Sequence, residues 1–93
     1  MRSLRPSTAF RRDYRREKAG KHGKRLDDLL RAVLDRLVAD TPLPPANRDH
    51  ALTGEWSSYR DCHLKPDLVL IYCKPDSETL DLVRLGSHSE LFG

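Results

Sequence analysis

Three of the chain's four histidines, His50, His63 and His88, lie in the second half of the 93 residues, together with Asp67. An unperturbed imidazole has a pKa of about 6.5, so both of its protonation states are populated near neutral pH. Two imidazoles in one site can therefore act as general base and general acid, and a carboxylate can orient a ring or act as the base itself. This set suits a reaction that moves two protons.

Cleavage of an RNA phosphodiester is such a reaction. One group takes the proton of the 2′-hydroxyl, a second protonates the departing 5′-oxygen, and cations hold the charge that develops on phosphate. Arg84 offers a planar guanidinium fork for phosphate oxygens. Phe92, four residues after His88, can stack on an unpaired base if this segment forms a helical turn. The residues needed for metal-independent RNA cleavage are therefore present.

Each of these residues also has a plainer interpretation. A histidine on a strand or loop is usually a surface or hydrogen-bonded residue, and Asp67 directly follows a proline, as turn residues often do. Arg84 could simply form an ion pair, and Phe92 could fill the edge of the core. Zinc is a further alternative, but the spacings of 13, 4 and 21 residues within the set match no helical or knuckle motif.

Positive charge is concentrated at the start of the chain. Residues 1–40 hold 12 Lys and Arg against 6 Asp and Glu, whereas residues 41–93 hold 5 against 8. Between Arg2 and Arg25, ten basic residues are opposed only by Asp13 and Glu17. A polyanion is a natural partner for such a segment, although a solvated helix face explains a single charge run equally well.

Length and composition predict one folded domain, residues 1–93. Hydrophobic residues make up 38% and charged residues 33%, and a chain of this length supports one small core. No apolar run approaches the ~18 residues that cross a membrane, and the first residues lack the apolar stretch of a secretory signal, so we expect a cytoplasmic protein. Cys62 and Cys73 match no Cys-x-x-Cys spacing and are expected to be core or strand thiols.

Two helices are predicted in the first 40 residues. Ser7 or Thr8 can cap the first, which places Phe10 and Tyr14 on one face and stops near Gly20. The second is marked by apolar residues at the spacing of one buried stripe, and the prolines that follow end it. Its apolar residues are Leu26, Leu29, Leu30, Val33, Leu34, Leu37 and Val38.

The rest of the chain predicts an antiparallel sheet with strands at 56–63, 68–74 and 79–85, joined by short turns. The segment 68–73 is apolar throughout, which is typical of a central strand covered on both faces. We expect the helices on one face, and the other face free to form a cleft roofed by a ligand or partner. Leu4 and its neighbours would add an edge strand. Pairing of His63 with Leu68 would separate the two thiols by roughly 13 Å and exclude a disulfide.

Three motifs carry a family resemblance: Leu-x-Gly-x-Trp at 52–56, Tyr-Arg-Asp-x-His at 59–63 and Gly-x-His-x-x-Leu-Phe-Gly at 86–93. With residues 43–51, 64–67, 70–72 and 84–85 around them, they resemble the RelE superfamily of bacterial toxins, above all its YafQ branch. The resemblance implies an α+β fold, with two N-terminal helices packed on one face of a small antiparallel sheet. It further implies a toxin that cleaves mRNA in the ribosomal A site and halts translation, with no metal or other cofactor.

The resemblance also assigns roles to residues. His88 corresponds to the general acid, and RelE itself relies more on Lys, Arg and Tyr, so the histidines point to YafQ-like chemistry. The catalytic set that matches by position is His50, His63, Asp67, His88 and Phe92. The phosphates of mRNA and ribosomal RNA would be held by Arg84 and by the basic helix with Arg11, Arg12, Arg15 and Arg16.

The expected partners are mRNA on the 70S ribosome and a cognate antitoxin, with operator DNA bound only through the toxin–antitoxin complex and with no membrane. The basic segment would attract an acidic antitoxin as readily as RNA. The main alternative is a ParE-like toxin that binds DNA gyrase without cleaving RNA, since such proteins share the fold. A third is an inactive relative that only binds antitoxin. The three histidines and Phe92 favour the nuclease.

Overall fold

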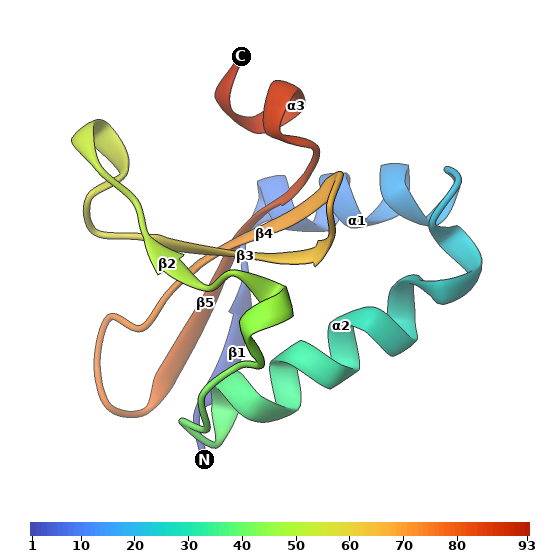
Figure 1. Cartoon of the computed structure of the whole chain (residues 1–93). Coiled ribbons are helices and arrows are strands. Elements are labelled where there is room, and N and C mark those ends of the chain that lie inside the picture. Colours follow the sequence, from blue (N-terminus) through green and yellow to red (C-terminus); the bar gives the residue numbers. More distant parts are fainter.

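The computed structural model describes all residues, 1–93, and places a five-stranded sheet beside three helices (Figure 1). The strands lie in the order β1-β5-β4-β3-β2, with β1 parallel to β5 and the other pairs antiparallel. Along the chain the elements are β1 (Ser3–Pro6), α1 (Thr8–Lys18), α2 (Gly23–Val38), η1 (Pro45–Asn47), β2 (His50–Ala51), η2 (Gly54–Trp56), β3 (Arg60–Lys65), β4 (Leu68–Cys73), β5 (Thr79–Gly86) and α3 (His88–Phe92), where η denotes a 3₁₀ turn. The predicted α+β class is confirmed.

Both predicted N-terminal helices form. The Ser7 hydroxyl accepts a hydrogen bond from the Phe10 amide at 2.9 Å, so Ser7 is the N-cap of α1. The helix ends at Lys18, and α2 begins at Gly23, where a Cβ would lie 2.1 Å from the Lys18 carbonyl oxygen. Only glycine permits this tight connection between the helices. None of the three helices has the length and apolar character that crossing a membrane would need.

The sheet differs from the prediction in three places. Residues 54–56 form the turn η2, so β3 begins at Arg60, and the two-residue strand β2 adds an edge that the sequence did not predict. His63 pairs with Val69, not Leu68, because a bulge lies between His63 and Lys65. The assumed register was therefore wrong by one residue, and both cysteines are free. The edge strand around Leu4 is confirmed as β1.

Apolar side chains fill both faces of the sheet. The larger cluster joins α1 and α2 to alternate residues of the strands, such as Leu70 and Tyr72, as predicted. A smaller cluster on the other face contains Val69, Ile71 and Leu91, with Trp56 packed against it. That second face was expected to be open for a ligand or partner. Instead the chain covers part of it itself, with α3 and the segment around η2, while β4 is buried on both sides as predicted.

Candidate active site

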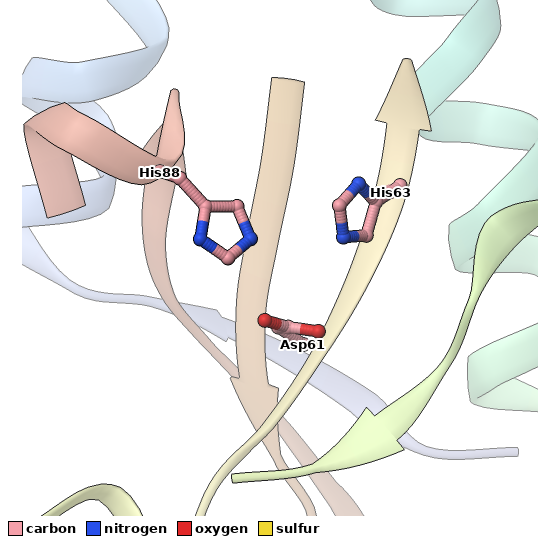
Figure 2. Close-up of side chains that lie close together, drawn as sticks. All are labelled: Asp61, His63 and His88. Atoms are coloured by element: carbon pink, nitrogen blue, oxygen red, sulfur yellow. The ribbon is translucent and has the colours of Figure 1, made fainter. Parts of the chain in front are cut away.

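Two predicted site residues, His63 and His88, and a third polar residue, Asp61, converge on the face of the sheet opposite α1 and α2. Asp61 and His63 are two residues apart on β3, so their side chains share a face, and His88 approaches from the start of α3 (Figure 2). Their ligating atoms all lie within 4.8 Å of one another, and the rings of His63 and His88 have centroids 5.5 Å apart. Two imidazoles separated by 25 residues of sequence thus form one site.

His50 joins this group from the edge strand β2, directly opposite Asp61 in the pairing with β3. Its Nδ1 lies 2.8 Å from the carbonyl oxygen of Arg48 and 3.1 Å from the nearer carboxylate oxygen of Asp61. Since a carbonyl oxygen can only accept, Nδ1 carries the proton in this bond. In the neutral ring Nε2 is therefore the unprotonated nitrogen, which is the state that a general base requires.

Asp61 is a candidate site residue that the sequence interpretation missed. It is fully buried, and neither carboxylate oxygen has a hydrogen-bond partner. The His50 nitrogen at 3.1 Å is close enough for electrostatic attraction, but its hydrogen bond goes to the Arg48 carbonyl. A buried carboxyl group without a hydrogen-bond partner is uncommon, and this one lies within reach of three imidazoles. The signal was available, because strand alternation places Asp61 beside His63 within the Tyr-Arg-Asp-x-His motif.

Asp67 lies in the turn between β3 and β4 and contacts different residues. Its carboxylate pairs with Lys21 Nζ at 2.5 Å and with His22 Nε2 at 3.0 Å. The hydrogen bond from Lys21 lowers the pKa of Asp67, and the bond from His22 adds to this. The imidazole that Asp67 contacts is therefore that of His22, which the sequence interpretation had set aside, and the pair ties this turn to the connection between α1 and α2.

Phe92 lies on the helical turn that the sequence required of it. Ser87 and Glu90 form a reciprocal capping box at the start of α3, and the Phe92 ring stands 5.2 Å from His88 and 5.8 Å edge-on to Trp56. Phe92 remains 37% exposed, so an unpaired base can reach it. A hollow of about 200 Å³ opens here, lined by His50, Leu52, Thr53, Trp56, Asp61, His88 and Phe92.

Comparison with known proteins finds a matching family over almost the whole chain. Residues 2–93 match the family described as the bacterial toxin of type II toxin–antitoxin systems, YafQ. The chain belongs to the YafQ family.

Named relatives share both sequence and fold with this YafQ-family chain. The mRNA interferase toxin YafQ of Escherichia coli K12 is 43% identical over 65 residues, which is 69% of this chain and 70% of that protein. A copper-bound mutant toxin from Helicobacter pylori superposes with a TM-score of 0.85 at 39% identity, covering 99% of this chain and all of the other. YafQ in the E. coli DinJ–YafQ complex superposes at 0.81 and 31% identity, covering both chains fully.

In this YafQ-family chain, Arg84 is bound to a carboxylate of α1. Its Nε and Nη2 donate to the two oxygens of Asp13 at 2.6 and 3.2 Å, while Arg16 and the Leu85 amide also donate to Asp13 at 2.9 and 3.0 Å. Asp13 is fully buried. Burial opposes its ionisation, but the bonds from Arg84 and Leu85 outweigh that cost and leave its pKa lowered. Five arginines were predicted to hold phosphate. Two of them, Arg84 and Arg16, donate hydrogen bonds to Asp13 instead.

The other three predicted phosphate contacts, Arg11, Arg12 and Arg15, are exposed on α1. The Asp61–His63–His88 group also offers one carboxylate and two imidazoles to a metal ion, a ligand set suited to zinc or copper. An ion held there would occupy the nitrogen lone pairs that proton transfer needs, so binding and acid–base catalysis would exclude one another.

Proposed function

We propose that this YafQ-family chain is the toxin of a type II toxin–antitoxin system and an endoribonuclease that cleaves translated mRNA in the ribosomal A site. The supporting observation is the convergence of His50, His63 and His88 around the buried carboxylate of Asp61. The reaction is metal-independent general acid–base catalysis, and its consequence is the inhibition of translation in the cytoplasm.

The two proton transfers have natural donors and acceptors in this site. His50 Nε2 removes the proton of the 2′-hydroxyl, and the resulting 2′-oxygen attacks the adjacent phosphorus. His88 donates a proton to the departing 5′-oxygen, so the products are a 2′,3′-cyclic phosphate and a 5′-hydroxyl. His63, with its ring 5.5 Å from that of His88, donates a hydrogen bond to a phosphate oxygen.

The remaining residues place the substrate. Phe92 stacks on a base next to the scissile bond, since its exposed ring forms a wall of the hollow that also contains His50 and His88. Asp67 also belongs to the proposed site. It lies in the turn between β3 and β4, where it pairs with Lys21 and His22. Arg11, Arg12 and Arg15 on α1 bind phosphates of ribosomal RNA or mRNA, which gives the toxin its dependence on the ribosome.

A cognate antitoxin is the second partner in this proposal. The E. coli relative is known in a DinJ–YafQ toxin–antitoxin complex. An acidic antitoxin segment would be attracted to the same basic helix as RNA, so antitoxin and ribosome compete for the toxin. Operator DNA is contacted only through the complex with the antitoxin.

The gyrase-binding alternative has less support. It requires only the fold, whereas the match over residues 2–93 is to the YafQ family and the histidines meet in one place. A protein that only binds gyrase has no need for three converging imidazoles beside a buried carboxylate.

Primer extension on a reporter mRNA in a translating extract tests the proposal. Added wild-type protein should produce cuts within codons, which disappear when ribosomes are omitted or when His88→Ala replaces the wild type. Arg31→Ala, which removes an exposed charge from α2 outside the basic segment, is the control and should cut normally. Intact translation with no cuts from any variant would reject the nuclease and direct attention to DNA supercoiling by gyrase.

A further inference from the structure

A second hollow, the η1–β3 hollow, shares His63 with the group formed by Asp61, His63 and His88. It encloses about 390 Å³ and is lined by Ala46, Asn47, Arg48, His63, Leu64, Lys65 and Pro66. The side-chain amide of Asn47 donates to the His63 carbonyl at 2.8 Å and holds η1 against β3. The volume is in the range of small-molecule binding sites and admits a phosphate with its ribose.

The charges around this hollow are all positive. Arg48 and Lys65 line it, no carboxylate does, and neither cation takes part in an ion pair of the chain. The nearest acidic residues in sequence are occupied: Asp49 accepts from Tyr72 and Arg60, and Asp67 pairs with Lys21 and His22. Two unpaired cations in a concave site favour an anionic ligand.

The backbone at Arg48 adds a second, independent observation. Its φ of 48° and ψ of 46° lie in the left-handed region, which costs a residue such as arginine roughly 1–2 kcal/mol. The only other non-glycine residue with positive φ is Asp40, a type that adopts this region more readily. Local strain of this kind is concentrated at functional sites. The Arg48 carbonyl also accepts the hydrogen bond that fixes His50.

The opposite wall has a matching irregularity. The bulge between His63 and Lys65 changes the direction in which Lys65 leaves the sheet, as bulges beside active sites commonly do. His63 lines the η1–β3 hollow and is also a member of the group with Asp61 and His88. An RNA strand whose scissile phosphate lies among the imidazoles therefore has a cationic hollow directly next to it.

We propose that the η1–β3 hollow is a subsite for a backbone phosphate of the RNA substrate flanking the scissile phosphate, with Arg48 and Lys65 as its ligands. This rests on the proposed ribonuclease function and extends it. Arg48 binds the phosphate through its side chain and positions His50 through its carbonyl, so occupation of the subsite and placement of the general base depend on the same residue. Arg84, by contrast, is already bound to Asp13.

The test is binding of a 2′-O-methyl RNA oligonucleotide, which cannot be cleaved, to His88→Ala protein over a range of salt concentrations. Arg48→Gln and Lys65→Gln are each compared with Arg31→Gln, which removes an exposed, unpaired charge from α2. Each contact to a single strand contributes about 0.7 to the slope of log K against log salt. We expect each of the two variants to lose about 0.7 from the slope and about tenfold in affinity at low salt. Arg48→Lys should retain most of the slope.

Slopes for both variants equal to that of Arg31→Gln, or no binding by the parent protein, would overturn the subsite. The subsite would also be overturned if the two variants bound a hexaglutamate peptide more weakly but bound RNA normally, because the hollow would then bind an acidic protein. The experiment needs no cleavage. Failure of the primer-extension test would therefore reject the nuclease separately, while unchanged slopes with normal mRNA cleavage would reject only the subsite.

Discussion

We infer that Asp61 lowers the stability of the folded protein but supports its activity. A buried carboxylate without a hydrogen-bond donor costs free energy of folding, and Asp61 has no donor on either oxygen. Its position among His50, His63 and His88 provides the compensation, because a carboxyl group can orient an imidazole ring. We infer that the chain accepts a less stable sheet in return for a polar group next to the imidazoles.

Asp61→Asn should raise the stability of the protein and lower its activity. Removal of the unpartnered carboxyl group should increase the free energy of unfolding by about 1 kcal/mol, which corresponds to about 4–8 °C in Tm for a domain of this size. Cleavage in the translating extract should fall at least tenfold. Asp49→Asn is the matched control and should lower Tm, since Asp49 accepts from Tyr72 and Arg60. A lower Tm for Asp61→Asn with unchanged cleavage would contradict this role.

At the residue scale, the sequence identified the imidazoles but not all of their partners. Three histidines on one small scaffold were visible because the residue type itself indicates the chemistry. The role of Asp61 was not, since a carboxylate on a strand also fits an exposed position, and β3 was expected to begin four residues earlier. The Arg84 partner was equally hidden, because Asp13 lies 71 residues away in the chain.

The element that decides the geometry of the site is α3. It is five residues long and is held in place by contacts with α1. Arg16 on α1 reaches the Leu85 carbonyl at 2.8 Å and the Glu90 carboxylate at 3.3 Å, while Glu90 itself caps α3. Gly86 lets these groups approach, since a Cβ there would come 2.8 Å from Arg16 Nη2 and 3.1 Å from Glu90 Oε1. A short helix that would not persist alone is thereby fixed with His88 at its start.

Gly86→Ala should therefore shift α3 and impair cleavage more than folding. The Arg16 side chain can move aside, so we expect Tm to fall by no more than about 4–8 °C, the effect of about 1 kcal/mol. The displacement of His88 should reduce cleavage about tenfold or more, because a misplacement on the order of 1 Å is costly in catalysis. Gly20→Ala, where the nearest atoms lie at 3.5 Å, is the control. Equal cleavage by both variants would show that α3 tolerates the shift.

Among the elements, prediction succeeded where a pattern extended over several residues. The stripe of α2 and the continuous apolar run of β4 each specify one structure over their length. By contrast, β2 has two residues and exists only because His50 and Ala51 pair with β3. Such a strand has no periodicity of its own, and Trp56, the last residue of η2, was taken for the start of a strand for the same reason. Both elements carry or border residues of the proposed site.

For the whole molecule, the pKa shifts predict how stability depends on pH. Seven carboxyl groups have lowered pKa values, and hydrogen bonds from Lys74 and Arg2 take that of Asp40 to about 2. A lowered pKa in the folded state adds stability that is fully present above the unfolded pKa of about 4 and is lost as pH falls through the folded value. Tm should therefore vary little between pH 7 and 5 and decrease below pH 4.

Asp13→Asn should change this profile in a specific way. At pH 7 the variant should lose about 2 kcal/mol, because Arg84 and Arg16 keep their charges without the carboxylate. Below pH 4 its stability should fall less steeply than that of the wild type, since one of the linked protons is gone. Thermal melts of both proteins from pH 7 to pH 2.5 measure the difference. Parallel curves would mean that Asp13 is not ionised in the folded protein.

The assignment of His88 as general acid can be tested most directly with a synthetic mRNA on 70S ribosomes. Sulfur replaces the bridging 5′-oxygen at the cleavage position that primer extension maps. A thiolate leaves without protonation because thiols are far stronger acids than alcohols. If His88 is the general acid, His88→Ala should fail to cleave the oxygen-containing mRNA but should cleave the sulfur-containing mRNA about as fast as wild type. Equal loss of cleavage on both mRNAs would contradict it.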